Sequence, residues 1–235
     1  MNKEKKKKKI LLVAATAMEV KLLTDECTFI GSGADYFKTY AFGPTHFDLL
    51  ITGIGTTFTT FFLTQVLLSE PYSLVLNTGI AGSLSDSLRI GDVVNVVEEE
   101  FADPGIEKEN EILTLFDSGF MHPDEFPFEN RVIKADATHY ASMLSRVKGV
   151  TSGIGHGRES SIFELKNRFS ASVESMEGAA VFYVCRWLGV PCLQIRAISN
   201  RVEPCDKASW DIPLALENLK SALLKVLTRL HDENS

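Results

Sequence analysis

Residues 173–200 read VESMEGAAVFYVCRWLGVPCLQIRAISN, and this stretch decides the fold class. The small residues at 178–180 favour a helix that begins close against its neighbours, and Gly189 favours a tight turn after it. The apolar run at 190–198 is typical of a strand covered on both faces. A buried helix followed by such a strand predicts an α/β protein.

Polar side chains lie at both ends of this unit. Glu177 stands at the entrance of the helix, whereas Arg196 and Asn200 come near the carboxyl end of the strand. Open α/β sheets bind ligands beyond the carboxyl ends of their strands. The pattern therefore predicts a ligand site built from a carboxylate, a guanidinium and an amide. For Asn200 the alternative is a structural role, in which its amide caps the turn after the strand.

The composition fits one sizeable domain. The chain has 235 residues, of which 45% are hydrophobic, enough for a full core. The first ten residues hold six Lys and one Glu, a formal charge of +5, so residues 11–235 carry −12 within a total of −7. We expect a solvated tail at 1–9 and one domain at 10–235. A nucleic-acid or membrane arm is the alternative for the tail, but the acidic body argues against a nucleic-acid partner.

The sequence predicts a cytoplasmic protein that does not enter a membrane. The apolar run at 10–15 is too short for a secretory signal and leads directly into an acidic helix. No apolar stretch approaches the roughly 20 residues of a membrane span. The four cysteines, at 27, 185, 192 and 205, lack metal-binding or CxxC spacing, and two of them fall in expected core elements. We therefore expect reduced thiols and no metal site.

Two interpretations apply to Glu19. Residues 10–15 predict a buried strand, and Thr16 with Glu19 three residues later fits the capping box of a helix. A carboxylate just beyond the first strand also fits a general base above the sheet. The local sequence leaves both roles open.

The segment at 74–82, LVLNTGIAG, predicts a strand that runs into a small-residue loop. Gly79 and its neighbours would let a ligand approach backbone amides closely, although a plain tight turn is the alternative. Other expected elements are strands at 36–42, 47–51 and 90–97, helices at 56–69, 137–147 and 159–169, and a long helix from Asp211 whose buried face carries Leu216, Leu219, Leu223, Val226, Leu227 and Leu230. We expect the phenylalanines at 58, 61 and 62 to pack in the core.

Residues 98–130 break the pattern, with three prolines, many acids and scattered aromatics. A long irregular segment in a compact domain indicates a lid or an oligomer contact. The following Gly-rich stretch, VTSGIGHG at 150–157, predicts a strand and a loop. His156 in this loop is either a ligand contact or an exposed loop residue.

Five motifs occur in a fixed order: AMEV at 17–20, NTGIAG at 77–82, GDVV at 91–94, MEGA at 176–179 and RAISN at 196–200. In their order and spacing they resemble the nucleoside phosphorylase/nucleosidase superfamily. The resemblance covers nearly the whole chain beyond the Lys-rich tail. It implies a three-layer α/β/α fold around a mixed, twisted sheet and a homo-oligomer. It also implies a small-molecule nucleoside substrate and no metal or organic cofactor.

The resemblance also implies roles on the sugar side of the site. Glu19 matches the carboxylate that activates the attacking water, and Arg196 matches the arginine near that water. Glu177 matches the residue that holds the ribose hydroxyls, with Met176 packing on the sugar. These residue types suit N-glycosidic cleavage, which passes through a cation-like sugar that carboxylates stabilise.

On the base side, Asn200 matches the position that engages N7 of the leaving purine, and the loop with Gly155 and His156 matches the segment that lines the base. Ile80 stands where related methylthioadenosine nucleosidases tend to carry Ser, so a side-chain polar contact is lost there. An Asn amide donates to a 6-oxo oxygen and accepts from a protonated N7, whereas the Asp of adenine-specific relatives would repel that oxygen. Asn200 thus predicts a hypoxanthine-type base.

Three hypotheses about function remain. The leading one is a hydrolase that releases hypoxanthine, because the region before Gly79 has no Arg with which to hold phosphate. The second is an adenine-releasing nucleosidase of the methylthioadenosine/adenosylhomocysteine or aminodeoxyfutalosine type. The third is a nucleoside-binding module without activity, against which the retention of Glu19, Glu177 and Arg196 argues.

Overall fold

The computed structural model describes residues 9–109, 112–204 and 209–233, so the expected Lys-rich tail lies outside it apart from Lys9. The helices are α1 (Ala17–Thr24), α2 (Thr56–Ser69), α3 (Glu159–Arg168), α4 (Gly178–Leu188), α5 (Ile212–Asp232) and the 3-10 helix η1 (Thr138–Ala141). The strands are β1 (Ile10–Ala14), β2 (Thr28–Ala34), β3 (Phe37–Phe42), β4 (Thr45–Ile51), β5 (Leu74–Ser83), β6 (Val93–Phe101), β7 (Gly105–Glu107), β8 (Ile112–Thr114), β9 (Ile133–Lys134), β10 (Ser145–Thr151), β11 (Val173–Ser175) and β12 (Cys192–Arg201).

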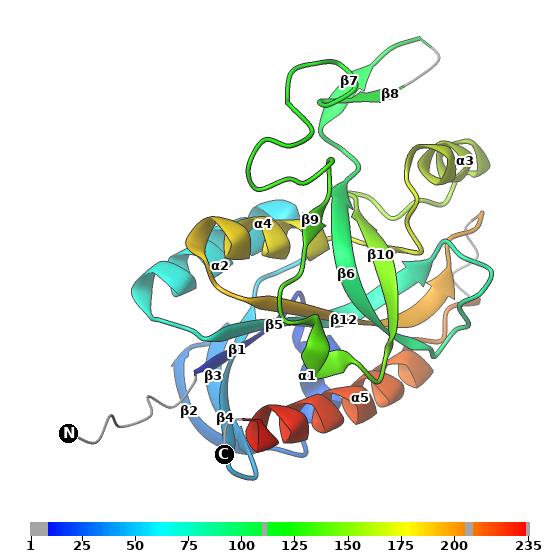
Figure 1. The fold of residues 1–235 in the computed structure, drawn as a ribbon. Coiled ribbons are helices and arrows are strands. Elements are labelled where there is room, and N and C mark those ends of the chain that lie inside the picture. The colour runs from blue at the N-terminus through cyan, green and yellow to red at the C-terminus, as the bar shows by residue number, and fades with distance from the viewer. Residues whose placement is uncertain (1–8, 110–111, 205–208, 234–235) are drawn as a thin grey trace.

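The central sheet is mixed, as the sequence predicted (Figure 1). Its strands follow the order β11-β10-β6-β12-β5-β1-β4-β3-β2, with β9 paired to β6, while β7 and β8 form a separate hairpin. β5 runs parallel to β1 and β12, whereas β12 and β6 are antiparallel. The carboxyl ends of β1, β5 and β12 therefore meet at one edge, where α/β sheets hold their ligands.

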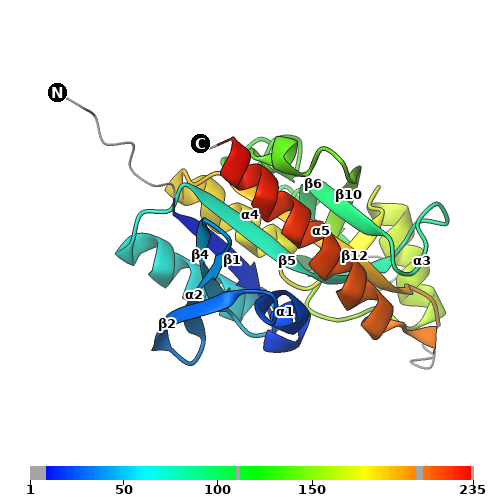
Figure 2. The same cartoon turned by 90° about the horizontal axis from the view of Figure 1, so that it is seen from below.

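Helices cover both faces of this sheet and give the fold three layers. α1 and α5 lie on one face, which Figure 2 views from below, and α2 and α4 lie on the other. Side chains alternate along each buried strand. Leu12 of β1 and Leu193 of β12 pack in the core under α5, whereas Leu11 and Val13 pack in the core under α4. This alternation explains why the strands read as continuous apolar runs.

A second pairing of β11 closes part of the sheet on itself. β11 is hydrogen-bonded to β10 and also to β5, so β5, β12, β6, β10 and β11 form a ring. Glu174 of β11 and Asn200 of β12 are both register partners of Gly82 on β5. The ring therefore brings together three residues that are far apart in the sequence.

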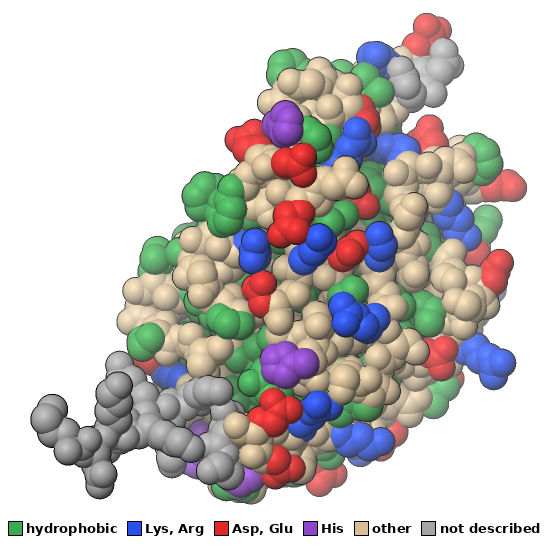
Figure 3. Space-filling model, viewed as in Figure 1, with side chains coloured by type: hydrophobic (Ala, Val, Ile, Leu, Met, Phe, Trp, Pro, Cys, Tyr) green, Lys and Arg blue, Asp and Glu red, His purple; other side chains and the backbone are tan. Residues whose placement is uncertain are grey.

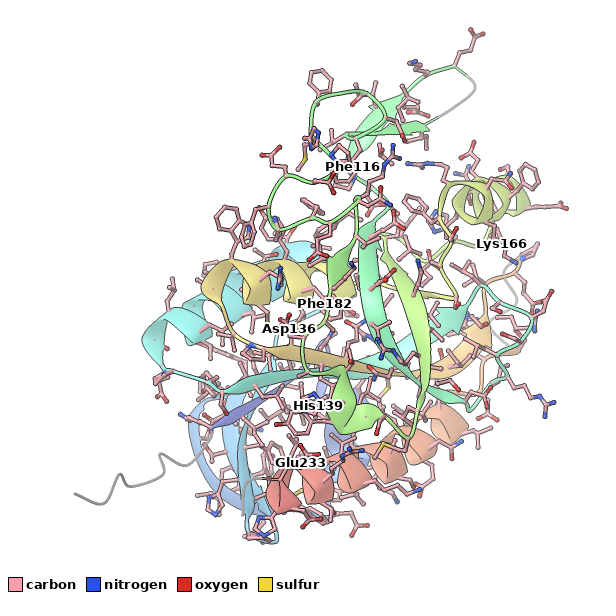
Figure 4. The ribbon with its side chains drawn as sticks, in the orientation of Figure 1. Phe116, Asp136, His139, Lys166, Phe182 and Glu233 are labelled. Carbon is pink, nitrogen blue, oxygen red and sulfur yellow. The ribbon has the colours of Figure 1, made fainter. Side chains whose placement is uncertain are left out.

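The expected C-terminal helix is confirmed as α5. Asp211 caps it, because its Oδ1 accepts a hydrogen bond of 3.0 Å from the backbone N–H of Leu214. The face expected to be buried is buried, at Leu216, Leu219, Leu223, Val226, Leu227 and Leu230. Near its other end, His139 of η1 lies close to Glu233, with Nε2 and Oε2 3.8 Å apart (Figure 4).

Two expected elements are wrong in kind. Residues 79–82 form no loop, because β5 runs on to Ser83 and pairs there with β12 and β11. Residues 137–147 are not one helix but η1 followed by the start of β10. The helix-like spacing was misleading because pairing of residues 145–151 with β6 overrides local propensity.

Other expectations need new boundaries. The strand expected at 90–97 is β6, which begins after a turn at Gly91 (φ +91°) and continues to Phe101. The irregular segment at 98–130 includes the end of β6 and the β7–β8 hairpin. Core packing of the phenylalanine cluster is wrong for Phe58 and Phe61, which are 57% and 64% exposed. The reason is that α2 buries a different face, marked by Thr59, Leu63 and Leu67.

Acidic and basic side chains are interspersed on the face seen in Figure 3, with no basic patch of the kind that binds nucleic acid. No helix within the described residues is long and apolar enough to cross a membrane.

Candidate active site

Glu19 forms the capping box that the sequence predicted, and its position at the end of the sheet is compatible with the other role, that of a general base. It stands in the first turn of α1, where its Oε2 accepts hydrogen bonds from the backbone N–H and the hydroxyl of Thr16, at 2.9 and 3.1 Å. Its Oε1 accepts a third bond, of 3.1 Å, from the backbone N–H of Ile80 on β5. The carboxylate is thus a helix cap that is also buried and oriented at the end of the sheet.

Gly79 lets two charged groups meet above β5. A Cβ on this residue would lie 2.5 Å from Nη1 of Arg196 and closer still to Oε1 of Glu19. Real Cβ atoms essentially never approach that closely, so a side chain here would displace both groups. The predicted close approach at Gly79 is therefore made by the protein's own catalytic candidates. Ile80 contributes its N–H, while its side chain packs toward the core under α5.

Arg196 is buried and incompletely paired. Its side chain is 1% exposed, and Nη2 lies 3.5 Å from Oε2 of Glu177 in an ion pair. Nε and Nη2 make no hydrogen bond to any described residue. Because buried donors are nearly always satisfied in folded proteins, these two N–H groups indicate a position for a bound oxygen.

Glu177 approaches Arg196 from the start of α4. Its Oε1 accepts a hydrogen bond of 3.1 Å from the backbone N–H of Gly55, the residue before α2. Burial raises the pKa of Glu177, with a further increase from the Glu19 carboxylate, while Arg196 and the N–H groups of Gly55 and Met176 oppose the rise. Met176 is half-buried beside it.

Asn200 is buried and bonded to its sequence neighbours. Its Oδ1 accepts a hydrogen bond of 2.8 Å from the Ser199 hydroxyl, and its Nδ2 donates a hydrogen bond of 3.0 Å to the carbonyl of Arg201. The amide also packs against Gly82 of β5, because a Cβ on Gly82 would lie 3.2 Å from Nδ2. The local structural role is therefore real, and one N–H of the amide is left for another acceptor.

His156 is brought to this end of the ring by Glu174. The ring Nδ1 makes a short hydrogen bond with Oε1 of Glu174. The backbone N–H of His156 donates a hydrogen bond of 3.3 Å to Oε2 of the same carboxylate. This bond raises the pKa of His156 against the opposing effect of burial. Glu174 shares its register partner, Gly82, with Asn200. Gly155, next to the histidine, is exposed.

The arrangement suits cleavage of a bond that leaves a cation. Glu19 and Glu177 are two carboxylates beside one guanidinium, in a buried place where charge interactions are strong. Asn200, four residues beyond Arg196 on β12, and His156 offer further hydrogen-bonding groups.

Known proteins resemble this chain over most of its length. The model of the Phosphorylase superfamily matches residues 9–230. The chain is 30% identical over 193 residues to futalosine hydrolase from Streptomyces coelicolor, covering 78% of this chain and 79% of that protein. It is 28% identical over 192 residues to aminodeoxyfutalosine nucleosidase from Helicobacter pylori, covering 77% of each.

The chain belongs to the Phosphorylase superfamily. The fold of this superfamily member also matches a solved 5′-methylthioadenosine/S-adenosylhomocysteine nucleosidase from Colwellia psychrerythraea in complex with adenine. The TM-score is 0.80 at 18% identity, over 96% of each chain. The named relatives are nucleosidases, and this member of the superfamily is accordingly an N-glycosyl hydrolase.

Two buried carboxylates of this superfamily member escaped the sequence analysis as site components. Glu174 received no role from the sequence, whereas in the structure it holds His156 from β11. Glu99 was hidden in an acidic run, EEE at 98–100, that reads as solvated. Strand alternation was the available signal, because the middle residue of three must face the other way from its neighbours.

Proposed function

We propose that this protein hydrolyses the N-glycosidic bond of futalosine and releases hypoxanthine. The nucleosidase assignment is shared by the relatives named above. Three curated relatives, including the one from Streptomyces coelicolor, carry the name futalosine hydrolase. The resemblance implies a step in menaquinone biosynthesis.

The observation that carries the proposal is the guanidinium of Arg196 beside Glu19, because its Nε and Nη2 make no hydrogen bond to any described residue. A water molecule bound between them would accept from Arg196 and donate to the carboxylate. It would then lose its proton to Glu19 as it attacks the sugar. The Ile80 N–H and the Thr16 groups hold Glu19 in one orientation, so it needs no rearrangement to act.

Glu177 is proposed to bind the ribose hydroxyls. Its ionised carboxylate accepts hydrogen bonds from two neighbouring hydroxyl groups, which fixes the sugar and favours positive charge on the ring. Gly55 and Arg196 keep one edge of that carboxylate in place, which supports this role.

Asn200 is proposed to select the base. On leaving, hypoxanthine gains a proton at N7 and keeps a carbonyl at C6. One amide can serve both groups, because its oxygen accepts and its nitrogen donates. Adenine carries an amino group at C6, which would meet the amide N–H donor to donor.

Water is favoured over phosphate as the nucleophile. Phosphate needs several cationic groups, whereas Arg196 is accompanied by Glu177 at 3.5 Å and by Glu19 across Gly79. Two carboxylates in a buried site repel an incoming anion.

The alternative is an adenine-releasing nucleosidase. Its support is the relative named aminodeoxyfutalosine nucleosidase, whose identity to this chain is nearly the same as that of the futalosine hydrolases. The Asn200 amide is the feature against it.

Product chromatography tests the proposal. The purified protein is offered futalosine, aminodeoxyfutalosine, methylthioadenosine and inosine, each with and without phosphate. We expect hypoxanthine from futalosine without phosphate. Adenine from the amino substrates would favour the alternative, and a requirement for phosphate would make the protein a phosphorylase.

A further inference from the structure

Glu99 is a fully buried carboxyl group behind the site described above. It lies on β6 and is 0% exposed. Gln194 Nε2 donates to its Oε1 at 2.6 Å, and the Thr151 hydroxyl donates to its Oε2 at 2.9 Å. Buried carboxylates are rare without such partners, and these bonds tie β6 to β12 and β10.

The hydrogen bonds continue beyond Glu99 on both sides. Nδ2 of Asn77 on β5 donates a hydrogen bond of 2.7 Å to Oε1 of Gln194. On the other side, the backbone N–H of Ala179, in the first turn of α4, donates a hydrogen bond of 2.8 Å to the Thr151 hydroxyl. A buried polar chain thus links the ends of the ring strands to the helix that begins just after Glu177.

Two glycines make room for the Glu99 carboxyl. A Cβ on Gly178 would lie 2.6 Å from its Cδ and 2.7 Å from Nε2 of Gln194. A Cβ on Gly149 of β10 would lie 2.5 Å from its Oε1. The carboxyl therefore packs directly against the first residue of α4, next in sequence to Glu177.

Arg196 and Glu177 dominate the charge around this group. Arg196 and Gln194 are two residues apart on β12 and so face the same side of the strand. Burial raises the pKa of Glu99 to about 7, its hydrogen bonds and Arg196 oppose the rise, and Glu177 adds to it.

The remaining elements packed against Glu99 contribute neutral contacts at Thr151, Gly149 and Gly178, and Asn77 is linked to Glu99 only through Gln194. On β10, Lys148 is paired with Glu98, which faces the opposite side of β6 from Glu99. Glu19 acts on this cluster through Glu177.

We propose that Glu99 is a positioning residue that shares Arg196 with Glu177 and thereby controls how firmly Glu177 is held for the ribose hydroxyls. This inference rests on the proposed role of Glu177 in the nucleosidase reaction. While Glu99 keeps its proton, Arg196 interacts fully with Glu177. When Glu99 ionises, the second carboxylate competes for the guanidinium and repels Glu177.

The proposal makes substrate binding depend on pH near neutrality. As pH rises through the ionisation of Glu99, we expect KM to increase by about tenfold, the factor that corresponds to one unit of pKa. Because the attacking water lies on the Glu19 side, kcat should change less than KM.

Glu99→Gln tests this dependence. Glutamine has nearly the same shape, fills the space beside Gly178 and mimics the protonated acid. We expect the variant to keep a low KM from pH 6 to pH 8.5, whereas KM of the unaltered protein rises. The matched control is Glu98→Gln, which removes a neighbouring carboxylate on the opposite face and should leave the pH profile unchanged. Identical profiles for Glu99→Gln and the unaltered protein would overturn the proposal.

Thr151 offers a second variant if Glu99→Gln does not fold. Thr151→Val removes a donor that favours the ionised form of Glu99, so the rise in KM should move to higher pH. Thr151→Ser restores the hydroxyl and should restore the original profile. The same dependence of KM on pH in Thr151→Val and Thr151→Ser would also overturn the proposal.

A measurement without substrate separates this inference from the proposed function. The infrared carbonyl band of a protonated carboxylic acid should disappear as pH rises through about 7 in the unaltered protein and be absent in Glu99→Gln. In Glu177→Gln the disappearance should move to lower pH, because a like charge is lost and Arg196 is released to Glu99. An unshifted band would contradict the sharing of Arg196 even if futalosine is hydrolysed. A shifted band in a protein that hydrolyses none of the four nucleosides would refute the proposed function alone.

Discussion

The two ends of the site are built differently. The Arg196 corner, consisting of Glu19, Arg196 and Glu177, takes one charged group each from α1, β12 and the start of α4. The Asn200 corner, consisting of Asn200, His156 and Glu174, joins an amide bonded to its own neighbours with a histidine in a loop. The first leaves buried donors unpaired, whereas the second satisfies most of its own groups.

This difference has a chemical consequence. Backbone N–H groups hold Glu19 and Glu177 in place, so the first corner is oriented before substrate arrives, as electrostatic catalysis would require. In the second corner, one N–H of the Asn200 amide already donates to the Arg201 carbonyl, so a bound base can accept a hydrogen bond only from the other N–H. We therefore expect substitutions at the Arg196 corner to change rate, and substitutions at the Asn200 corner to change which base is released.

The largest effect should come from Glu19→Gln. Loss of the general base should reduce kcat by about 10²–10⁴-fold in a steady-state assay of base release. Glutamine still fits a capping box, but its amide NH2 would meet the Ile80 N–H donor to donor, so activity is compared at a temperature at which the variant is shown by circular dichroism to be folded. Glu26→Gln, an exposed carboxylate just beyond the same helix, is the control. A fully active Glu19→Gln protein would end the claim that this corner sets the rate.

Asn200→Asp should have the next largest effect. A carboxylate repels the 6-oxo oxygen and accepts from a 6-amino group, so the ratio of kcat/KM for futalosine to that for aminodeoxyfutalosine should fall by roughly 10²-fold or more. Competition of the two nucleosides in one reaction measures the ratio directly. Asn95→Asp is unsuitable as a control because that residue is fully buried. Asn167→Asp, at an exposed position on α3, is preferable. An unchanged ratio would show that base choice resides elsewhere.

A smaller effect is expected from Glu174→Gln. The ionised Glu174 raises the pKa of His156, so their interaction stabilises the fold fully below about pH 6.5 and is lost as pH rises through the raised pKa. The variant should therefore lose more unfolding free energy, measured in urea, at pH 6 than at pH 9. Glu233→Gln, which alters the exposed pair with His139, should show little of this difference. Equal losses at both pH values would mean that the pair is not ionic.

The smallest effect should come from Phe61→Ser. Since this side chain is 64% exposed, its loss should change the unfolding free energy of the monomer by only about 0.5 kcal/mol. Urea denaturation over a range of protein concentrations measures it. A larger, concentration-dependent loss would indicate that the expected homo-oligomer covers this face of α2.

Much of this architecture was predictable because it rests on local patterns. The strand at β12, the helices α2 and α3 and the buried face of α5 follow from apolar periodicity and turn residues. The Arg196 corner was also predictable, because its groups lie at strand and helix ends that an α/β sheet brings together.

The remainder depends on pairing between distant segments. The three-residue strand β11 is too short to show a period, and it is this strand that closes the ring and positions Glu174. Residues 145–147, expected in a helix at 137–147, instead begin β10 and pair with β6. Glu99 was missed because its burial depends on Gly149 and Gly178, which reach it from β10 and α4.

The most direct measurement of the central claim is the ratio of two initial rates for the unaltered protein in phosphate-free buffer. One is hypoxanthine release from futalosine, and the other is adenine release from aminodeoxyfutalosine at the same concentration. An Arg196 corner that hydrolyses and an Asn200 corner that selects a 6-oxopurine predict rapid hypoxanthine release and a ratio above about 10². Equal rates, or faster release of adenine, would contradict the account of base selection, and no release of either base without phosphate would contradict the account of hydrolysis.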